Sequence, residues 1–384
     1  MSQFMKKLVL FFVLLFVLPT FSQKEVETFT SARLGEVREI TISLPPSYTK
    51  DSKKKFPLVL LLDGDYLMDP FLGVLNYGTY FEDFPEVIVV GITQNYNHER
   101  DTDCQTEEAT GLPIGKGNHF FDFIGMELMP YITKKYRVAP FKIIAGHDIT
   151  AAFANFFLYK DNPVFDAYIS MSPELPVGME EQVPDRLQLV EKPIFYYQSV
   201  CNSDIKQMQE KIKLLDEQVK VLNKPTLYYK FDEFNNQSHY SMVLSSIPSA
   251  LYHIFSFYRP ISPSEFLEKI APMTENQTTY LINKYEMLDK LFSIKIAVRL
   301  TDFKAIERGI LITSNLQEFE NLAAYAKKVY PKSMLSDYYL GVMNEKIGLL
   351  ERAKKFYKDA YSKEPIGDLT KEMMMNKIYE YKEQ

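Results

Sequence analysis

The chain has 384 residues, which is long for one domain and predicts two. Its apolar content of 46% and charged content of 24% are ordinary for a globular protein. The formal net charge of −6, with scattered lysines and no basic stripe, gives no reason to expect a nucleic-acid partner.

The N-terminus has the pattern of a targeting segment. Two lysines precede an apolar run over residues 8–18, and small residues then fit a cleavage site before Gln23. The apolar run is short for a membrane span. We therefore predict a signal peptide over residues 1–22, export to the periplasm or the extracellular space, and no membrane span after cleavage. An uncleaved N-terminal anchor is the alternative.

One alternating run and six mostly apolar runs predict the strands of a single sheet, after a polar approach segment over residues 24–34. Apolar and polar residues alternate over residues 37–44, as in a half-buried strand. Continuous apolar strands are expected in a parallel sheet that is covered on both faces by helices. Such runs span residues 56–62, 87–92, 143–145, 165–171, 193–200 and, more amphipathic, 225–231.

Helical patterns alternate with these runs. They span residues 120–136, 149–159, 205–222 and 240–258. Strand and helix alternate over roughly 200 residues, which indicates an α/β fold with a doubly wound, mostly parallel sheet. In such sheets, ligand sites lie at the carboxyl ends of the strands.

After residue 263 the chain reads as helices. One stretch matches the offsets of a tetratricopeptide unit of about 34 residues, with Leu340, Gly341, Gly348, Ala353, Tyr357, Ala360 and Pro365. Helix pairs of this kind stack to share an apolar face. They would offer a surface to a peptide or protein partner. Unrelated helical hairpins are the alternative.

A strand, a tight turn and a helix meet over residues 142–153. This is the arrangement of a nucleophile elbow, whose pattern is Gly-X-Ser-X-Gly. Gly146 is kept, but Asp148 stands at the serine position and Thr150 at the closing glycine. Asp is among the few residues besides glycine that tolerate the positive φ of such a turn. We therefore expect the turn to survive the loss of the hydroxyl.

The groups that a hydrolase needs follow in the chain order of this fold, which is nucleophile, acid and histidine. Asp204 follows the run that ends at residue 200, and His239 lies in a polar loop before a long apolar helix. We expect His239 to be the base and Asp204 the acid that orients it. Helix capping by Asp204, or by the serines beside His239, is the alternative.

An oxyanion hole is expected from backbone donors, which need no particular side chain. The candidates are the N–H group of Ile149 and those of Asp65 and Tyr66, in the loop after the run 56–62. We assign no metal ligands and no cofactor.

The chain has two cysteines, Cys104 and Cys201, both in loops at the predicted carboxyl edge of the sheet. A disulfide between them would stiffen the mouth of the site. Two unpaired thiols are the alternative, because spacing alone cannot show a pairing.

Several segments together resemble the esterase family (esterase D-like) of α/β-hydrolases. They are residues 56–65, the Arg100–Asp101 pair, residues 120–136, Gly146–His147, Ser172–Pro173 and residues 239–241. The resemblance covers residues 35–258, and residues 264–384 form a separate tetratricopeptide-like domain. The resemblance to the esterase family implies serine-esterase ancestry, with Asp148 at the nucleophile position, His239 as base and Asp204 as acid. The chain departs from the family at the elbow.

The aspartate at position 148 is compatible with esterase ancestry but argues against ordinary ester hydrolysis. A carboxylate that attacks an ester carbonyl forms a mixed anhydride, which is more reactive than the ester consumed. Attack at an sp³ carbon would instead give an ordinary ester that water can hydrolyse. We expect a pseudoenzyme that binds an ester-like small molecule, or a partner through its helical region. The alternatives are hydrolysis through Asp148, or residual esterase activity through Thr150 or Ser172.

Overall fold

The computed structural model describes residues 24–96 and 98–380, so the predicted signal peptide lies outside the described residues. The chain forms two compact units. Of the described residues, the first unit holds 24–73, 86–138 and 142–247. The second unit holds residues 74–85, 139–141 and 248–380. The predicted domains, residues 35–258 and 264–384, stay a prediction.

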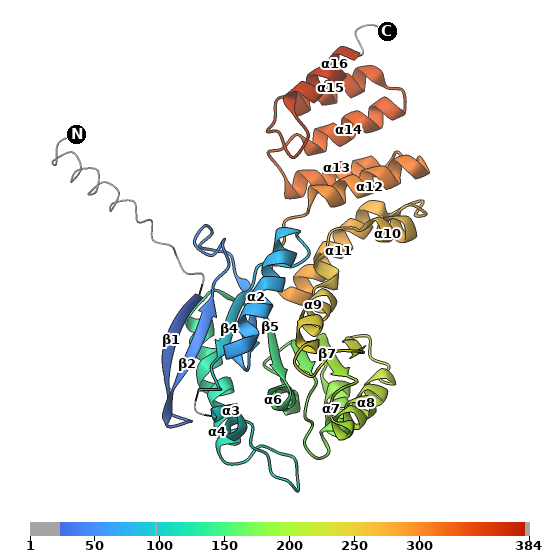
Figure 1. Cartoon of the computed structure of the whole chain (residues 1–384). Coiled ribbons are helices and arrows are strands. Elements are labelled where there is room, and N and C mark those ends of the chain that lie inside the picture. The colour runs from blue at the N-terminus through green and yellow to red at the C-terminus, as the bar shows by residue number, and fades with distance from the viewer. Residues whose placement is uncertain (1–23, 97, 381–384) are drawn as a thin grey trace, which may run out of the picture. The chain divides into compact units, whose positions relative to one another are not determined.

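The first unit is built on an eight-stranded sheet with the order β1-β2-β4-β3-β5-β6-β7-β8 (Figure 1). Its strands are β1 (Lys24–Ser31), β2 (Glu36–Ser43), β3 (Phe56–Leu61), β4 (Ile88–Ile92), β5 (Val138–His147), β6 (Ala167–Met171), β7 (Ile194–Cys201) and β8 (Leu227–Phe234). Strands β3 to β8 run parallel to one another. Strand β2 pairs antiparallel with β4, and β1 pairs antiparallel with β2 at the edge of the sheet. The mostly parallel α/β sheet predicted from the sequence is confirmed.

The prediction of an approach segment over residues 24–34 was wrong. Residues 24–31 form β1, which pairs with β2 from Lys24 opposite Ser43 to Ser31 opposite Glu36. This strand lies at the edge of the sheet, and Ser31 is its one fully buried residue. Because edge strands are often rich in charged residues, β1 lacks the apolar run that marks the inner strands.

Helices flank the sheet (Figure 1). They are α2 (Gly64–Tyr80), α3 (Glu99–Asp103), α4 (Lys116–Asp122), the π-helix η1 (Phe123–Leu128), α5 (Met129–Lys135), α6 (Ile149–Asn155), the 3₁₀-helix η2 (Phe156–Tyr159), α7 (Met179–Leu189), α8 (Lys206–Lys220) and α9 (Met242–Ile254). The helix expected over residues 120–136 is therefore α4, η1 and α5 in succession. The helices α2, α3 and α7 were not predicted.

From residue 255 to residue 380, the second unit contains helices and isolated bridges only. The helices are η3 (Ser256–Tyr258), α10 (Pro263–Glu265), η4 (Phe266–Ile270), α11 (Gln277–Phe292), α12 (Leu300–Thr313), α13 (Glu318–Val329), α14 (Leu335–Lys346), α15 (Leu350–Tyr361) and α16 (Lys371–Glu380). The predicted helical C-terminal region is confirmed.

The hairpin of α14 and α15 packs through a small residue. A Cβ atom on Gly341 would lie 2.5 Å from the ring of Tyr357, so glycine leaves the room that this ring fills. Ala353, Tyr357 and Ala360 are fully buried. This is the packing expected of a tetratricopeptide unit, but the assignment to that repeat class stays a prediction.

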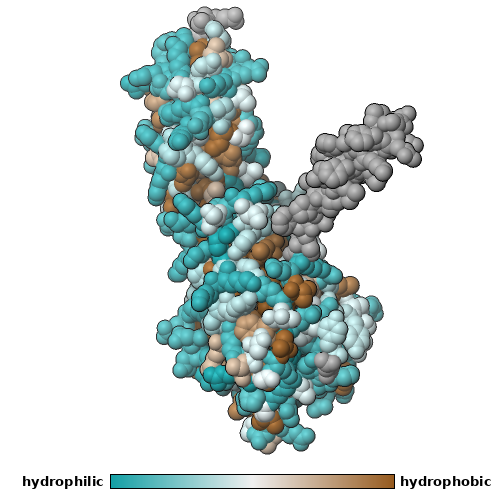
Figure 2. Space-filling view, turned by 90° about the vertical axis from the view of Figure 1, so that its left-hand side faces the viewer, coloured by the Kyte–Doolittle hydropathy of each residue, from teal (hydrophilic) through white to brown (hydrophobic). Residues whose placement is uncertain are grey.

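Among the described residues, no helix combines the length and the apolar character needed to cross a bilayer. The face shown in Figure 2 is mostly hydrophilic, with apolar residues in small, separate groups. Scattered apolar residues of this kind are ordinary on protein surfaces.

Candidate active site

The elbow lies between β5, which ends at His147, and α6, which begins at Ile149. Asp148 is the apex, with φ 61° and ψ −125°, a strained conformation for a residue with a side chain. A Cβ atom on Gly146 would lie 2.6 Å from the carbonyl carbon of Thr150. Glycine is therefore required where the helix folds back on the strand. The structure places Asp148 where an α/β-hydrolase carries its nucleophile.

His239 and Asp204 form a tight pair beside this elbow. Nδ1 of His239 lies 2.6 Å from Oδ1 of Asp204. The other oxygen, Oδ2, accepts the backbone N–H of Cys201 at 2.9 Å and the hydroxyl of Ser172. The Asp204 side chain has no exposed surface, whereas 23% of the His239 side chain is exposed. The predicted acid therefore orients the predicted base through a fully bonded, buried carboxylate.

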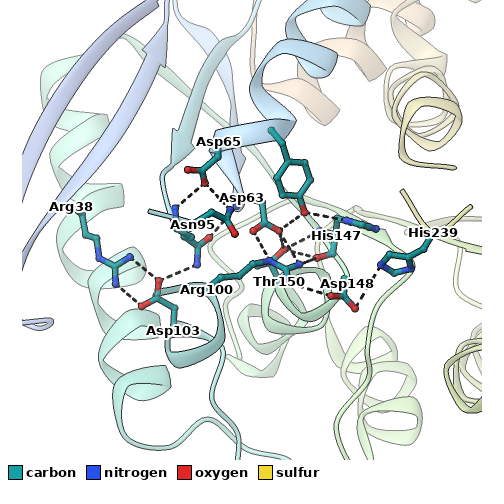
Figure 3. Close-up of polar contacts among 12 residues, drawn as sticks. Arg38, Asp63, Asp65, Asn95, Arg100, Asp103, His147, Asp148, Thr150 and His239 are labelled. Atoms are coloured by element: carbon teal, nitrogen blue, oxygen red, sulfur yellow. Dashed lines mark hydrogen bonds and ion pairs between the residues drawn. The ribbon is translucent and has the colours of Figure 1, made fainter. Parts of the chain in front are cut away.

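The pair faces the elbow. Nε2 of His239 lies 4.0 Å from Oδ1 of Asp148, longer than a hydrogen bond but within the range of an ion pair (Figure 3). The structure thus brings together the three residues that the sequence singled out, in the relation of nucleophile position, base and acid. Asp148 is the partly exposed carboxylate of the group, with 21% of its side chain in contact with solvent.

The ionisation of the pair favours charge on both partners. Burial would raise the pKa of Asp204, but hydrogen bonds from His239, Ser172 and Cys201 lower it to about 2. The hydrogen bond to Asp204 raises the pKa of His239 against the opposing effect of burial, and the charge of Asp148 adds to the rise. The rise in pKa shifts the imidazole toward its protonated form, and that form cannot accept a proton.

Arg100, on α3, joins the elbow to the strand beside it (Figure 3). Its Nε donates to Oδ1 of Asp63 at 2.7 Å, and its Nη2 lies 3.3 Å from Oδ2. Nη2 also donates to the carbonyl of His147 at 2.8 Å, and Nη1 to Oδ2 of Asp148 at 3.2 Å. Burial would lower the pKa of Arg100, but the Asp63 carboxylate and its hydrogen bond raise it.

Sequence reasoning missed this role of Arg100. The residue was noted only as part of a resemblance. The sheet order β4-β3-β5 would have predicted it, because Asp63 follows β3, Arg100 follows β4 and Asp148 follows β5. The carboxyl ends of neighbouring parallel strands meet at one edge, so these three residues converge there.

A buried polar network fixes the helix that carries Arg100. Arg38, on β2, makes a bidentate pair with Asp103 at 2.8 and 2.5 Å. Gln94 donates from Nε2 to Asp103 at 3.1 Å and accepts the backbone N–H of Asp63 at 3.1 Å. The backbone carbonyl of Gln94 accepts the backbone N–H of Arg100 at 2.8 Å. Because Arg38, Gln94 and Asp103 are all buried, the network fixes α3, and hence Arg100, against the sheet.

The hydroxyls of Thr150 and Ser172 are both bonded to buried carboxylates. Oγ1 of Thr150 lies 2.6 Å from Oδ2 of Asp63 and accepts the N–H of His147 at 3.0 Å. The Ser172 hydroxyl bonds to Asp204. Both residues are fully buried. Each hydroxyl is thus held by the carboxylate that it contacts, and the alternative that either one attacks a substrate stays a prediction.

The expected oxyanion loop is in fact the first turn of α2. Asp65 and Tyr66 lie in this turn, and the N–H of Tyr66 donates to the carbonyl of Asp63 at 3.2 Å. The Tyr66 amide is thus engaged by the turn itself. Its side chain reaches the site instead, with Oη 2.9 Å from Oδ2 of Asp63 and 3.1 Å from Nδ1 of His147. Ile149 remains at the open first turn of α6, where helix N–H groups lack intrahelical partners.

Cys104 and Cys201 are both free, so the possible disulfide is not formed and the alternative of two thiols holds. Cys104 ends α3 and packs against the apolar core. Cys201 ends β7, with its Sγ 3.5 Å from Oγ of Ser203. The two side chains therefore face different surroundings. Burial raises the pKa of both thiols.

An elbow after the central strand β5, followed by an acid after β7 and a histidine after β8, defines an α/β-hydrolase. Residues 31–208 match the family described as "Putative esterase". No protein of curated function matches the chain.

Solved structures support the same assignment of fold. A structure of an uncharacterised protein from Capnocytophaga ochracea has 27% identity and a TM-score of 0.85, over 94% of this chain and all of that one. An IroE-like serine hydrolase from Shewanella oneidensis has 21% identity and a TM-score of 0.59, over 79% of this chain and 99% of that one. The BES protein from Bacillus cereus has 23% identity and a TM-score of 0.53, over 61% and 95%. At these identities the last two show the fold alone.

Proposed function

We propose that this chain is an exported esterase-family homologue that has lost serine-esterase chemistry and uses the former catalytic site to hold a ligand. The observation that carries the proposal is Asp148 itself. The residue keeps the strained turn of a nucleophile, yet it presents a carboxylate that is bonded to Arg100 and faces His239. A carboxylate cannot form a stable acyl intermediate from an ester.

Two further observations support the loss of hydrolysis. The hydrogen bond to Asp204 raises the pKa of His239, and the charge of Asp148 raises it further, so the aspartate at the elbow weakens His239 as a proton acceptor in a way that a serine would not. The hydroxyls nearest to the elbow, on Thr150 and Ser172, are buried and bonded to other carboxylates.

A panel of p-nitrophenyl esters tests the proposal on wild type and Asp148→Ser. We expect no hydrolysis above the buffer rate for wild type. The serine variant should gain about 100-fold or more, because the His239–Asp204 pair is already in place. Asp148→Asn is the matched control, since it removes the charge without adding a hydroxyl. Ester turnover by wild type above the buffer rate would overturn the proposal, and its survival in Asp148→Asn would show that Asp148 is not the catalytic group.

A second candidate is hydrolysis at an sp³ carbon with Asp148 as nucleophile. The geometry favours it in one respect: Oδ2 is held by Arg100, while Oδ1 faces Nε2 of His239 at 4.0 Å. Oδ1 would bond to the carbon as the leaving group departs with its electron pair. Water activated by His239 would then cleave the resulting ester.

Mass spectrometry separates the two candidates. After incubation of His239→Gln with an epoxide or a haloalkane, the second candidate predicts a stable adduct on the peptide that contains Asp148. An unmodified Asp148 peptide would exclude it. Asp148→Asn, treated in parallel, controls for alkylation elsewhere.

Export and a partner for the helical region are also part of the proposal. Export rests on the pattern of residues 1–22. N-terminal sequencing of the secreted protein should begin at Gln23. The stacked helices of the second unit would supply the surface for a peptide or protein partner.

A further inference from the structure

The charges around the elbow do not balance. Three carboxylates, those of Asp63, Asp148 and Asp204, face one guanidinium, that of Arg100, and one imidazole, that of His239, so at least one negative charge stays unmatched whether or not His239 is protonated. Asp63 is paired with Arg100 and Asp204 with His239, and neither carboxylate is exposed. Asp148 is the third, with 21% of its side chain exposed. The serine-to-aspartate change thus places one surplus negative charge on the solvent side of the site.

Two aromatic rings flank the same site. The ring of Tyr66 lies 6.1 Å from that of His147 and meets it edge to face. The ring of Tyr240 lies 6.2 Å from His147 and 5.2 Å from His239. Both tyrosines are exposed, Tyr66 by 41% and Tyr240 by 79%. Exposed aromatic faces near a carboxylate attract organic cations.

His147 adds a polar group that lacks a partner. The residue is 2% exposed, and its Nε2 makes no hydrogen bond to any described residue. Its ring lies 4.4 Å from that of His239, within the group of site residues (Figure 3). Burial, and the charge of His239, lower the pKa of His147 to about 4, so it adds no positive charge at neutral pH. A buried nitrogen without a partner indicates a site that a ligand or water completes.

We propose that the elbow binds a small primary ammonium ion, with Asp148 as counter-ion and the rings of Tyr66 and Tyr240 as walls. The inference rests on the proposed function, because a site that does not turn over its ligand can hold it. Arg100 holds Oδ2 of Asp148, whereas Oδ1 lies 4.0 Å from Nε2 of His239, beyond hydrogen-bonding distance, so Oδ1 is the oxygen that accepts a hydrogen bond from the ammonium group. An anionic ligand would meet the same carboxylate and be repelled.

Calorimetric titration with three isosteric probes tests the ligand class. We expect benzylammonium to bind about 5- to 10-fold more tightly than neutral benzyl alcohol, and benzoate to show no binding. Benzyltrimethylammonium, which cannot donate a hydrogen bond, should bind more weakly than benzylammonium. Equal affinity for benzylammonium and benzyl alcohol would overturn the proposal.

Variants locate the binding. Asp148→Asn should abolish the preference for the cation, and Tyr240→Ala should weaken binding of benzylammonium about 5-fold. Asp185→Asn, which removes one exposed charge on α7, should leave the preference intact. Imidazole NMR signals of His147 and His239 should shift on binding in wild type. A preference that survives Asp148→Asn would show that the cation binds elsewhere.

The ester panel keeps the two proposals apart. Ester turnover by wild type would overturn the proposed loss of activity, whatever the titrations give. Absence of turnover together with absence of a cation preference would overturn the ligand class alone.

Discussion

Asp148 adopts a backbone conformation that costs free energy in any residue with a Cβ atom. Its φ of 61° and ψ of −125° belong to a region where such residues pay about 1–3 kcal/mol. We predict that Asp148→Gly is more stable than Asp148→Ala by about 1 kcal/mol. Both variants lose the carboxylate, so the difference between their free energies of unfolding reports the strain of the backbone alone. Urea unfolding measures it, and equal stabilities would show that the turn relaxes in the alanine variant.

The His239–Asp204 pair predicts a defined dependence on pH. Its hydrogen bond raises the pKa of His239 above the ordinary 6.5. The stability that His239 contributes is therefore fully present below pH 6.5 and is lost as the pH rises through the raised pKa. An NMR titration of wild type should give a His239 midpoint above 6.5, and Asp204→Asn should lower it. An unchanged midpoint in Asp204→Asn would contradict the assigned cause.

The stability that Asp204 contributes depends on pH in the opposite direction. The pKa of Asp204 falls from 3.8 to about 2, because hydrogen bonds outweigh burial. Its contribution, about 2 kcal/mol, is present above pH 3.8 and is lost as the pH falls toward 2. Unfolding measured at pH 5 and pH 2.5 should show a smaller loss of stability for Asp204→Asn than for wild type. Equal losses would place the acid sensitivity in other carboxylates.

At the scale of residues, the sequence predicted the parts of the site that are tied to chain order. Asp148, Asp204 and His239 converge as their positions after successive strands required. It did not predict the clamp of Arg100 on Asp63, which depends on the order of β3 and β4 in the sheet. Contacts between side chains on different strands need the sheet order, which a single sequence does not state.

At the scale of elements, α2 begins in direct contact with β4. A Cβ atom on Gly64 would lie 2.6 Å from the carbonyl carbon of Gly91, a backbone atom that cannot swing away. Gly64→Ala should therefore destabilise the protein by about 1–3 kcal/mol. Gly73→Ala is the matched control, since it lies in α2 with nothing within 4 Å of the added atom, and should stabilise by about 0.5–1 kcal/mol. Thermal unfolding that ranks the two variants otherwise would contradict the close approach.

The elements that the sequence missed share a physical cause. The inner strands were predicted because burial on both faces demands apolar residues. Strand β1 carries polar residues along an exposed edge and gave no such pattern. The first residues of helix α2 were expected to form a loop, and Asp63, Gly64 and Asp65 are residue types that are common in turns. The positive φ of Asp63, 54°, is indeed a turn, but the helix starts immediately after it.

At the scale of the whole molecule, the second compact unit is not one continuous stretch of chain. It includes residues 74–85 and 139–141, which precede the elbow in sequence. Phe141 packs its ring 4.9 Å from that of Phe292, and Phe84 lies 5.5 Å from Phe255. The helices after residue 263 therefore bury an aromatic side chain that β5 supplies.

This packing predicts that the sheet-bearing part of the chain cannot be separated from the C-terminal helices without loss of stability. A chain that ends at residue 262 loses Phe292 and uncovers Phe141, which is 2% exposed in the intact chain. We expect the shortened chain to melt at a lower temperature and to bind a hydrophobic dye. Phe292→Ala in the full chain reproduces the same loss without truncation and should cost about 3 kcal/mol in urea unfolding. If both variants keep the stability of wild type, the helices add nothing to the core that Phe141 enters, and the two parts of the chain fold independently.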